Sequence, residues 1–186
     1  MGSIGRKIDK VDAINEFNKF KDLLLPKHCE YGIDNITLSG SLRRGKEYEI
    51  GDIDIIITTL NGKIPSALTP MLKSSGYIID ASGENLIRML TSDNIQIDIY
   101  SCTESQFPMM IAYLTGPGEY NIQMRAVAKR KGFKLNQVSL MKDDGIVEVN
   151  SERHLFHILG CEYIEPQDRI NFYDSVKFHK YKKGGC

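Results

Sequence analysis

The sequence of 186 residues predicts an α+β protein, because helices, strands and hairpins follow one another in mixed order. Three stretches support this prediction. Residues 8–25 place apolar side chains at the spacing of one helix face. Residues 50–60, IGDIDIIITTL, alternate as the side chains of a strand do. Residues 136–149 carry Asp-Gly at the expected tip of a hairpin.

Helices are expected where apolar residues recur every three or four positions between capping and breaking residues. The first helix closes at Pro26, which cannot continue it, and the fifth ends at Gly132. Ser41 is a good N-cap for the second helix. In chain order, the expected helices are residues 8–25, 41–47, 65–75, 107–115, 119–131 and 151–160.

The expected strands contain aspartates, which strands disfavour. Asp52 and Asp54 are two residues apart, so their side chains leave the strand on the same side. Asp98 lies in a similar apolar run, IQIDIY, and all three carboxylates converge if the two strands lie side by side. The expected strands are residues 35–39, 50–60, 76–83, 84–90 and 95–100, followed by the 136–149 hairpin.

Three crowded carboxylates repel one another, and divalent cations remove that conflict. Mg²⁺ prefers a few carboxylates together with phosphates and water, and two such ions can clamp an in-line displacement at phosphorus. The alternative is that each aspartate is a solvated residue on the outer face of a strand. For Asp52 alone that alternative is favoured. The turn that precedes Asp52 reverses the preference.

That turn, SGSLRRG at residues 39–45, combines phosphate-binding features. Gly40 allows close backbone approach, and Ser41 with the following amides can hold a phosphate at a helix start. Arg44 can neutralise the outer phosphates of a nucleotide. Arg43 is either a phosphate contact or a surface charge. A Gly-rich turn by itself is a weak signal, but with two acids about ten residues later it indicates nucleotide chemistry.

Charge divides the chain although the net charge is zero. Residues 1–110 hold 12 Lys/Arg against 15 Asp/Glu, whereas residues 111–186 hold 12 against 9. Residues 121–134 contain five basic residues and no acidic one, so a polyanionic partner is compatible with overall neutrality. The charge break and the sequence TGPG place a lobe boundary near residue 115. We expect lobes at 1–114 and 115–171 and a flexible basic tail at 172–186.

Composition argues against several other classes of protein. No apolar run approaches the length of a membrane span, and the N-terminus carries no apolar signal segment. A cytoplasmic or nuclear protein that is not secreted and has no membrane partner is therefore expected. The four cysteines are far apart and include no CxxC pair, which makes a zinc site a weak alternative to free thiols.

Four segments resemble the family X DNA polymerases of the nucleotidyltransferase superfamily, over about residues 30–170. GSLRRGKEYEIGDIDIIIT at 40–58 resembles the family's Gly-Ser…Gly-Asp-x-Asp signature. YLTG at 113–116 resembles its Tyr-Phe-Thr-Gly segment. NIQMRAVAKRKGFKLNQ at 121–137 and HILGCEYIEPQDR at 157–169 resemble its thumb helix and its closing stretch. The order, spacing and short length are similar to the minimal viral members. The fold implied is a nucleotidyltransferase palm with a small thumb-like lobe.

The resemblance implies roles for individual residues. It makes Asp52, Asp54 and Asp98 the catalytic residues and the metal ligands, for two Mg²⁺ ions with Mn²⁺ as a substitute. The implied nucleotide-binding residues are Gly40, Ser41, Arg44, Gly51, Tyr113, Gly116 and Asn121. The implied DNA-binding residues are Arg125, Lys129, Arg130, Lys131 and Lys134. Tyr113 is expected beside the incoming sugar, although an ordinary core tyrosine is the alternative.

The predicted function is a template-directed DNA polymerase that fills short gaps in DNA repair, as in base excision repair. Its expected partners are dNTP and gapped or primer–template DNA, and the protein is expected to be a monomer in the cytoplasm or nucleus of a host cell. One alternative is a template-independent enzyme, or one that acts on RNA or a small molecule. A second is a non-catalytic DNA-binding module with structural carboxylates.

Overall fold

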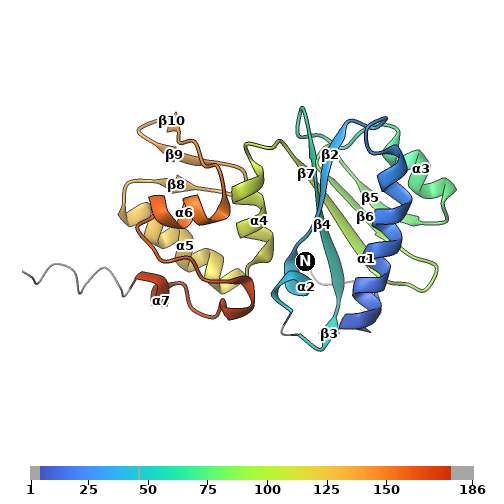
Figure 1. The fold of residues 1–186 in the computed structure, drawn as a ribbon, viewed down its shortest axis with the longest axis horizontal. Coiled ribbons are helices and arrows are strands. Elements are labelled where there is room, and N and C mark those ends of the chain that lie inside the picture. Colours follow the sequence, from blue (N-terminus) through green and yellow to red (C-terminus); the bar gives the residue numbers. More distant parts are fainter. Residues whose placement is uncertain (1–4, 46, 177–186) are drawn as a thin grey trace, which may run out of the picture. The chain divides into compact units, whose positions relative to one another are not determined.

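The computed structural model describes residues 5–45 and 47–176 (Figure 1). Helices and strands mix as the sequence predicts, and the α+β fold with a mixed sheet is confirmed. The chain divides into two compact units between Glu104 and Ser105. Among the helices of the described residues, none combines the length and apolar character that crossing a membrane requires.

The N-terminal unit is built on a five-stranded sheet (Figure 1). Only the central pair, β4 and β7, is parallel, and the other neighbours are antiparallel. Side by side in the sheet lie β2 (Ile33–Leu38), β4 (Asp52–Thr59), β7 (Gln96–Cys102), β6 (Leu86–Leu90) and β5 (Ile78–Ser82).

One face of this sheet carries the core of the unit. Ile53, Ile55 and Ile57 of β4 alternate onto that face and are completely buried, as period-two spacing requires. The helices α1 (Lys10–Leu24) and α3 (Leu68–Ser74) contribute apolar side chains to the same cluster. The face that carries Ile53, Ile55 and Ile57 therefore packs on helices, whereas Asp52, Asp54 and Ile56 point to the opposite face.

The segment before β4 differs from the expectation in two details. The expected strand 50–60 is interrupted at Gly51, because β3 (Glu49–Ile50) pairs instead with β1 (Ile8–Asp9). The expected helix 41–47 is α2 (Gly40–Arg44), and Ser39 rather than Ser41 occupies its N-cap position. The N-terminal residues of the first expected helix form β1, which pairs with this segment.

The C-terminal unit combines helices with a small antiparallel sheet. Its longest helix is α5, and its strands pair in the order β10-β9-β8. Its helices are α4 (Phe107–Thr115), α5 (Gly118–Arg130), α6 (Glu152–Ile158) and α7 (Tyr173–Val176). A 3-10 turn, η2 (Pro166–Asp168), also belongs to this unit, whereas η1 (Leu25–Lys27) follows α1 in the N-terminal unit. Its strands are β8 (Lys134–Leu135), β9 (Leu140–Lys142) and β10 (Gly145–Ile146).

Aromatic rings form the centre of the C-terminal core. Tyr120, Phe156 and Phe172 are completely buried, and the rings of Tyr120 and Phe172 meet edge to face at 5.0 Å between centroids. The buried Arg169 guanidinium lies near the Tyr120 and Phe156 rings, with its Nη1 2.8 Å from Glu152 Oε1. This ion pair compensates two charges inside the core.

Two expected boundaries differ from the structure. The units divide after Glu104, because α4 buries Met109 and Ala112 in the core of the C-terminal unit rather than in that of the first. The expected tail begins at residue 172, yet Phe172 is completely buried and α7 follows it. Residues 177–186 of that tail lie outside the described residues.

Candidate active site

The structure brings the three predicted aspartates onto one face of the sheet. The parallel register of β4 and β7 pairs Asp54 with Asp98 and Asp52 with Gln96. Adjacent strands lie about 4.8 Å apart, so Asp54 and Asp98 are direct neighbours and Asp52 is one position along the same face. This face is opposite the one that carries Ile53, Ile55 and Ile57. The parallel pairing decides the convergence, because it gives both strands the same direction and phase.

Two residues of the same sheet hold Asp98 with three hydrogen bonds. It is almost completely buried, with 1% of its surface exposed. Arg88 of β6 grips it with both ends of its guanidinium: Nε donates to Oδ1 at 2.9 Å and Nη2 donates to Oδ2 at 2.6 Å. Gln96 Nε2 also donates to Oδ1, at 3.1 Å. A buried carboxylate requires such compensation.

Arg88 and Gln96 were not predicted from the sequence as functional residues. Arg88 lies opposite Asp98 because β6 and β7 form an antiparallel hairpin with that register. A signal does exist in the sequence, since Arg88 is the one charged residue within the apolar run LIRML. Its use required the exact hairpin register, because a slip of one residue moves the arginine to the opposite face.

Burial and mutual repulsion disfavour the ionised forms of the other two carboxylates. Burial raises the pKa of Asp54 to about 7, and the charges of Asp52 and Asp98 add to this increase. Burial and the Asp98 charge raise the pKa of Asp52 as well. The positive charge of Arg88 opposes both shifts. The face thus carries more negative charge than its resident cations balance.

The donor set fits a hard divalent cation in its chemistry. Carboxylate oxygens are the ligands that Mg²⁺ prefers, and the raised pKa values of Asp52 and Asp54 indicate negative charge that a cation would relieve. Within residues 5–45 and 47–176, however, no three His, Cys, Asp or Glu side chains are gathered closely enough to hold a metal ion as they stand. In this arrangement Asp98 faces Arg88 instead.

The predicted phosphate turn is attached directly to the acidic strand. Gly40 has φ +64°, and a Cβ built there would lie 2.0 Å from Asp54 Oδ2, so a side chain is excluded. The Ser39 backbone N–H and its hydroxyl both donate to the Asp54 carbonyl oxygen, at 2.8 and 3.1 Å. Ser41, which follows Gly40, and Gly51, which precedes Asp52, are half-buried. Hydrogen bonds and close packing therefore hold the turn against Asp54.

Arg44 is the last residue of α2, the helix that this turn begins. Its Nε and Nη2 donate to Glu47 Oε1 at 3.0 and 2.5 Å, and its charge opposes the increase in the pKa of Asp54. Behind the turn, Lys10 Nζ of α1 donates to the Gly45 carbonyl oxygen at 3.0 Å. This bond anchors the end of α2 to the first helix.

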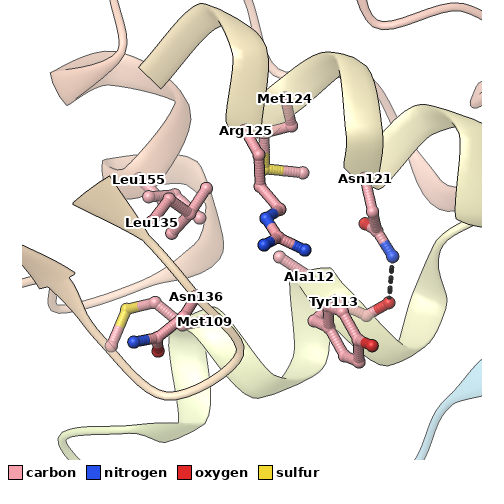
Figure 2. Close-up of a pocket in the computed structure, with 9 residues that line it drawn as sticks. All are labelled: Met109, Ala112, Tyr113, Asn121, Met124, Arg125, Leu135, Asn136 and Leu155. Atoms are coloured by element: carbon pink, nitrogen blue, oxygen red, sulfur yellow. Dashed lines mark hydrogen bonds between the residues drawn. The ribbon is translucent and has the colours of Figure 1, made fainter. Parts of the chain in front are cut away.

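The predicted contacts for the nucleoside meet in the C-terminal unit. Figure 2 shows a small pocket between α4 and α5, into which the Arg125 guanidinium points. Asn121 Nδ2 donates to the Tyr113 carbonyl oxygen at 2.6 Å, while Asn121 Oδ1 is buried and accepts no hydrogen bond from the described residues. Gly116, with φ +56°, ends α4 just beyond. The pocket is lined by Met109, Ala112, Tyr113, Asn121, Met124, Arg125, Leu135, Asn136 and Leu155.

The predicted DNA-binding residues are brought together only in part. Arg125, Lys129 and Lys134 line one groove on α5 and β8, and Ile122 and Phe133 also line it. Two others do not line it: the Arg130 guanidinium lies 5.3 Å from the Tyr173 ring centroid, and Lys131 is the C-cap residue of α5. We refer to the lining formed by Arg125, Lys129 and Lys134 as the basic groove.

The sequence is similar to those of several known proteins. The family model of the DNA polymerase beta thumb matches residues 110–170. Repair DNA polymerase X of African swine fever virus is 32% identical over a 143-residue alignment that covers 73% of this chain and 82% of that protein. DNA polymerase/3′-5′ exonuclease PolX of Bacillus subtilis is 31% identical over 70% of this chain and 23% of its own length. DNA polymerase lambda of Rattus norvegicus is 30% identical over 70% of this chain and 28% of its own length.

Proposed function

Because this chain belongs to the family X DNA polymerases, we propose that Asp52, Asp54 and Asp98 form its reaction centre. The chain is a DNA-directed DNA polymerase of DNA repair, and this excludes the alternatives of a non-catalytic DNA-binding module and of an enzyme that acts on RNA or a small molecule. The observation that carries the proposal is the parallel register that pairs Asp54 with Asp98.

The proposed reaction is nucleotidyl transfer to a primer end. The primer 3′-hydroxyl gives up its proton to solvent and its oxygen forms a bond to the α-phosphorus of a dNTP. The bond from that phosphorus to the bridging oxygen breaks, and pyrophosphate leaves with the electron pair of that bond. Asp52, Asp54 and Asp98 would hold divalent cations, two Mg²⁺ in our proposal with Mn²⁺ as a substitute. When bound, such ions neutralise phosphate charge and lower the pKa of the attacking hydroxyl.

The turn beside the acids is proposed to hold the triphosphate. The absence of a side chain at Gly40 lets the turn lie directly against Asp54, and the backbone N–H groups of Gly40 and Ser41 are proposed to donate to the phosphates. Arg44 supplies positive charge at the same place. Gly51, half-buried directly before Asp52, is proposed to let the backbone come close to the nucleotide.

The C-terminal unit is proposed to contact the nucleoside and the DNA. One Asn121 Nδ2 hydrogen serves Tyr113, and the other remains for an acceptor on a base edge. Tyr113 is proposed to lie near the sugar. The basic groove suits DNA phosphates, and the proposed substrate is gapped or primer–template DNA bound by a monomer. Since the chain resembles a viral enzyme, we propose that it acts in the cytoplasm or nucleus of a host cell.

The test is primer extension on a one-nucleotide gap, with each dNTP supplied in turn. Asp52→Asn, Asp54→Asn and Asp98→Asn each keep the side-chain shape and remove a charge, so each is expected to lower the extension rate by about 100- to 1,000-fold or more. The matched control is Asp34→Asn, an exposed strand residue of the same sheet, which is expected to leave the rate unchanged.

Two results would contradict the proposal. Near-parental extension by any of the three site variants would remove that carboxylate from the reaction centre. Equal incorporation of all four nucleotides opposite one template base would show that the template does not direct the choice. Circular dichroism of each variant establishes that the comparison is made between folded proteins.

A further inference from the structure

The contact between Arg88 and Asp98 lies on the acidic face, which is the sheet face that carries Asp52, Asp54 and Asp98. Arg88 is 8% exposed and Asp98 1%, so water competes little for either side chain. Two parallel N–H···O bonds of 2.9 and 2.6 Å join the guanidinium to both carboxylate oxygens. A fork of this kind fixes the plane and the rotation of the carboxylate, which a single hydrogen bond does not do.

The two oxygens of Asp98 are not equivalent in this arrangement. A carboxylate oxygen has two lone pairs and accepts about two hydrogen bonds. Oδ1 accepts from Arg88 Nε and from Gln96 Nε2, so its acceptor capacity is filled. Oδ2 accepts only from Arg88 Nη2 among the described residues, so one lone pair of Oδ2 remains.

We propose that Arg88 is the positioning residue of Asp98, and that it fixes the carboxylate so that Oδ2 alone is available to a divalent cation or to the primer hydroxyl. Gln96 takes part by occupying Oδ1. The inference rests on the proposed role of Asp98 in the reaction centre. It adds to that role the residue that sets the geometry and the oxygen that acts.

The arginine fork, rather than the positive charge alone, carries this role. A residue that only balanced the charge of Asp98 would be replaceable by lysine, since a lysine beside a carboxylate keeps its positive charge. Lysine does not reproduce two parallel donors in one plane. The Arg88→Lys variant therefore separates geometry from charge, and a change that persists in it reports positioning.

The experiment compares the parent with Arg88→Lys in two measurements. Mn²⁺ binding to the DNA-free protein is followed by the electron paramagnetic resonance signal of unbound Mn²⁺, and single-turnover extension is measured on a one-nucleotide gap. Removing a residue that orients a metal ligand weakens metal binding by about 10- to 100-fold. We expect Arg88→Lys to weaken Mn²⁺ binding by about 10-fold and to slow extension by at least as much, with the Kd of dNTP changed by less than about two-fold.

Two further variants complete the design. Gln96→Met removes the second donor to Oδ1 while the fork remains, and it is expected to shift both measurements in the same direction by about two- to five-fold. It keeps the proposal testable if Arg88→Lys does not fold. Arg153→Lys is the matched control, because Arg153 pairs with Glu165 at an exposed site of the other unit. It is expected to change neither measurement.

The proposal is overturned if a folded Arg88→Lys protein binds Mn²⁺ and extends primers within about two-fold of the parent. Tighter Mn²⁺ binding in that variant also overturns it, because Arg88 would then compete with the cation. Should Arg88→Lys not fold, unchanged Mn²⁺ binding by Gln96→Met has the same consequence. Failure of the proposed function is distinct, since it is read from retained extension by Asp98→Asn.

Discussion

The acidic face of the N-terminal unit and the basic groove of the C-terminal unit differ in how far their charged side chains are exposed and in how they are held. Asp98 is buried, and three hydrogen bonds from two neighbours fix it. Arg125, Lys129 and Lys134 are exposed and line an open groove. A charge in the interior acts through a medium of low dielectric constant, whereas water and salt screen an exposed one.

Geometry therefore matters more at the acidic face than in the basic groove. At the acidic face, a displacement of less than an ångström changes which oxygen is available, so single substitutions are expected to have large effects. In the basic groove, each cation adds a modest and salt-dependent term to the binding of a polyanion. Three substitutions test this contrast: Gly40→Ala through the extension rate, Asp54→Asn through unfolding without metal, and Lys129→Gln through DNA binding. In these measurements the expected effects decrease in that order.

Gly40→Ala tests the close approach of the turn to Asp54. The new Cβ would lie 2.0 Å from Asp54 Oδ2 at a residue with φ +64°, so either the turn or the carboxylate must move. A misplacement of about 1 Å at a reaction centre costs about 100-fold in rate, and we expect that loss in single-turnover extension. Gly83→Ala is the control, because its nearest neighbour would be 3.9 Å away. Equal rates for the two variants would contradict the close packing.

Asp54→Asn tests the electrostatic state of the acidic face without metal. The folded-state pKa of Asp54 is raised to about 7, mainly by burial, so its protonation stabilises the fold fully below 3.8, the ordinary pKa of an aspartate side chain. That stability is lost as the pH rises through 7, by at most about 1.4 kcal/mol per pH unit. Asparagine stays neutral, so the variant is expected to be the more stable protein at pH 8 and to differ less at pH 5.

The measurement is urea unfolding of both proteins with a chelator at pH 5, 6, 7 and 8. The difference in unfolding free energy between variant and parent is expected to grow across this series. A constant difference would mean that Asp54 ionises outside this range. Adding Mn²⁺ at pH 8 is expected to stabilise the parent more than the variant, because a cation relieves the charge that the variant lacks.

Lys129→Gln tests the basic groove, where only a small effect is expected. If Lys129 neutralises one phosphate, its loss lowers the slope of log binding constant against log salt by about 0.9 and weakens binding a few-fold at low salt. Arg130→Gln is the matched comparison, because its guanidinium lies over the Tyr173 ring rather than in the groove. Fluorescence anisotropy with gapped DNA measures both. Equal slopes for the two variants would show that DNA contacts are not confined to the groove.

The parts of this protein that depend on local pattern could be predicted from the amino-acid sequence alone. Period-two alternation placed Asp52 and Asp54 on one side of their strand, and apolar spacing with Gly132 beyond it located α5 within one residue at each end. The Gly-Ser turn before two acids was sufficient to indicate nucleotide chemistry. These features can be predicted because they depend only on residues that are close together in the sequence.

Which distant residues meet depends on the tertiary structure. The parallel pairing of β4 and β7 brings Asp98 to Asp54, and the β6–β7 register delivers Arg88 to Asp98. The burial of Phe172 in the C-terminal core depends on packing in the same way. Strand register and core packing are set by contacts between segments far apart in the chain, and a shift of one residue reverses the face on which every side chain lies.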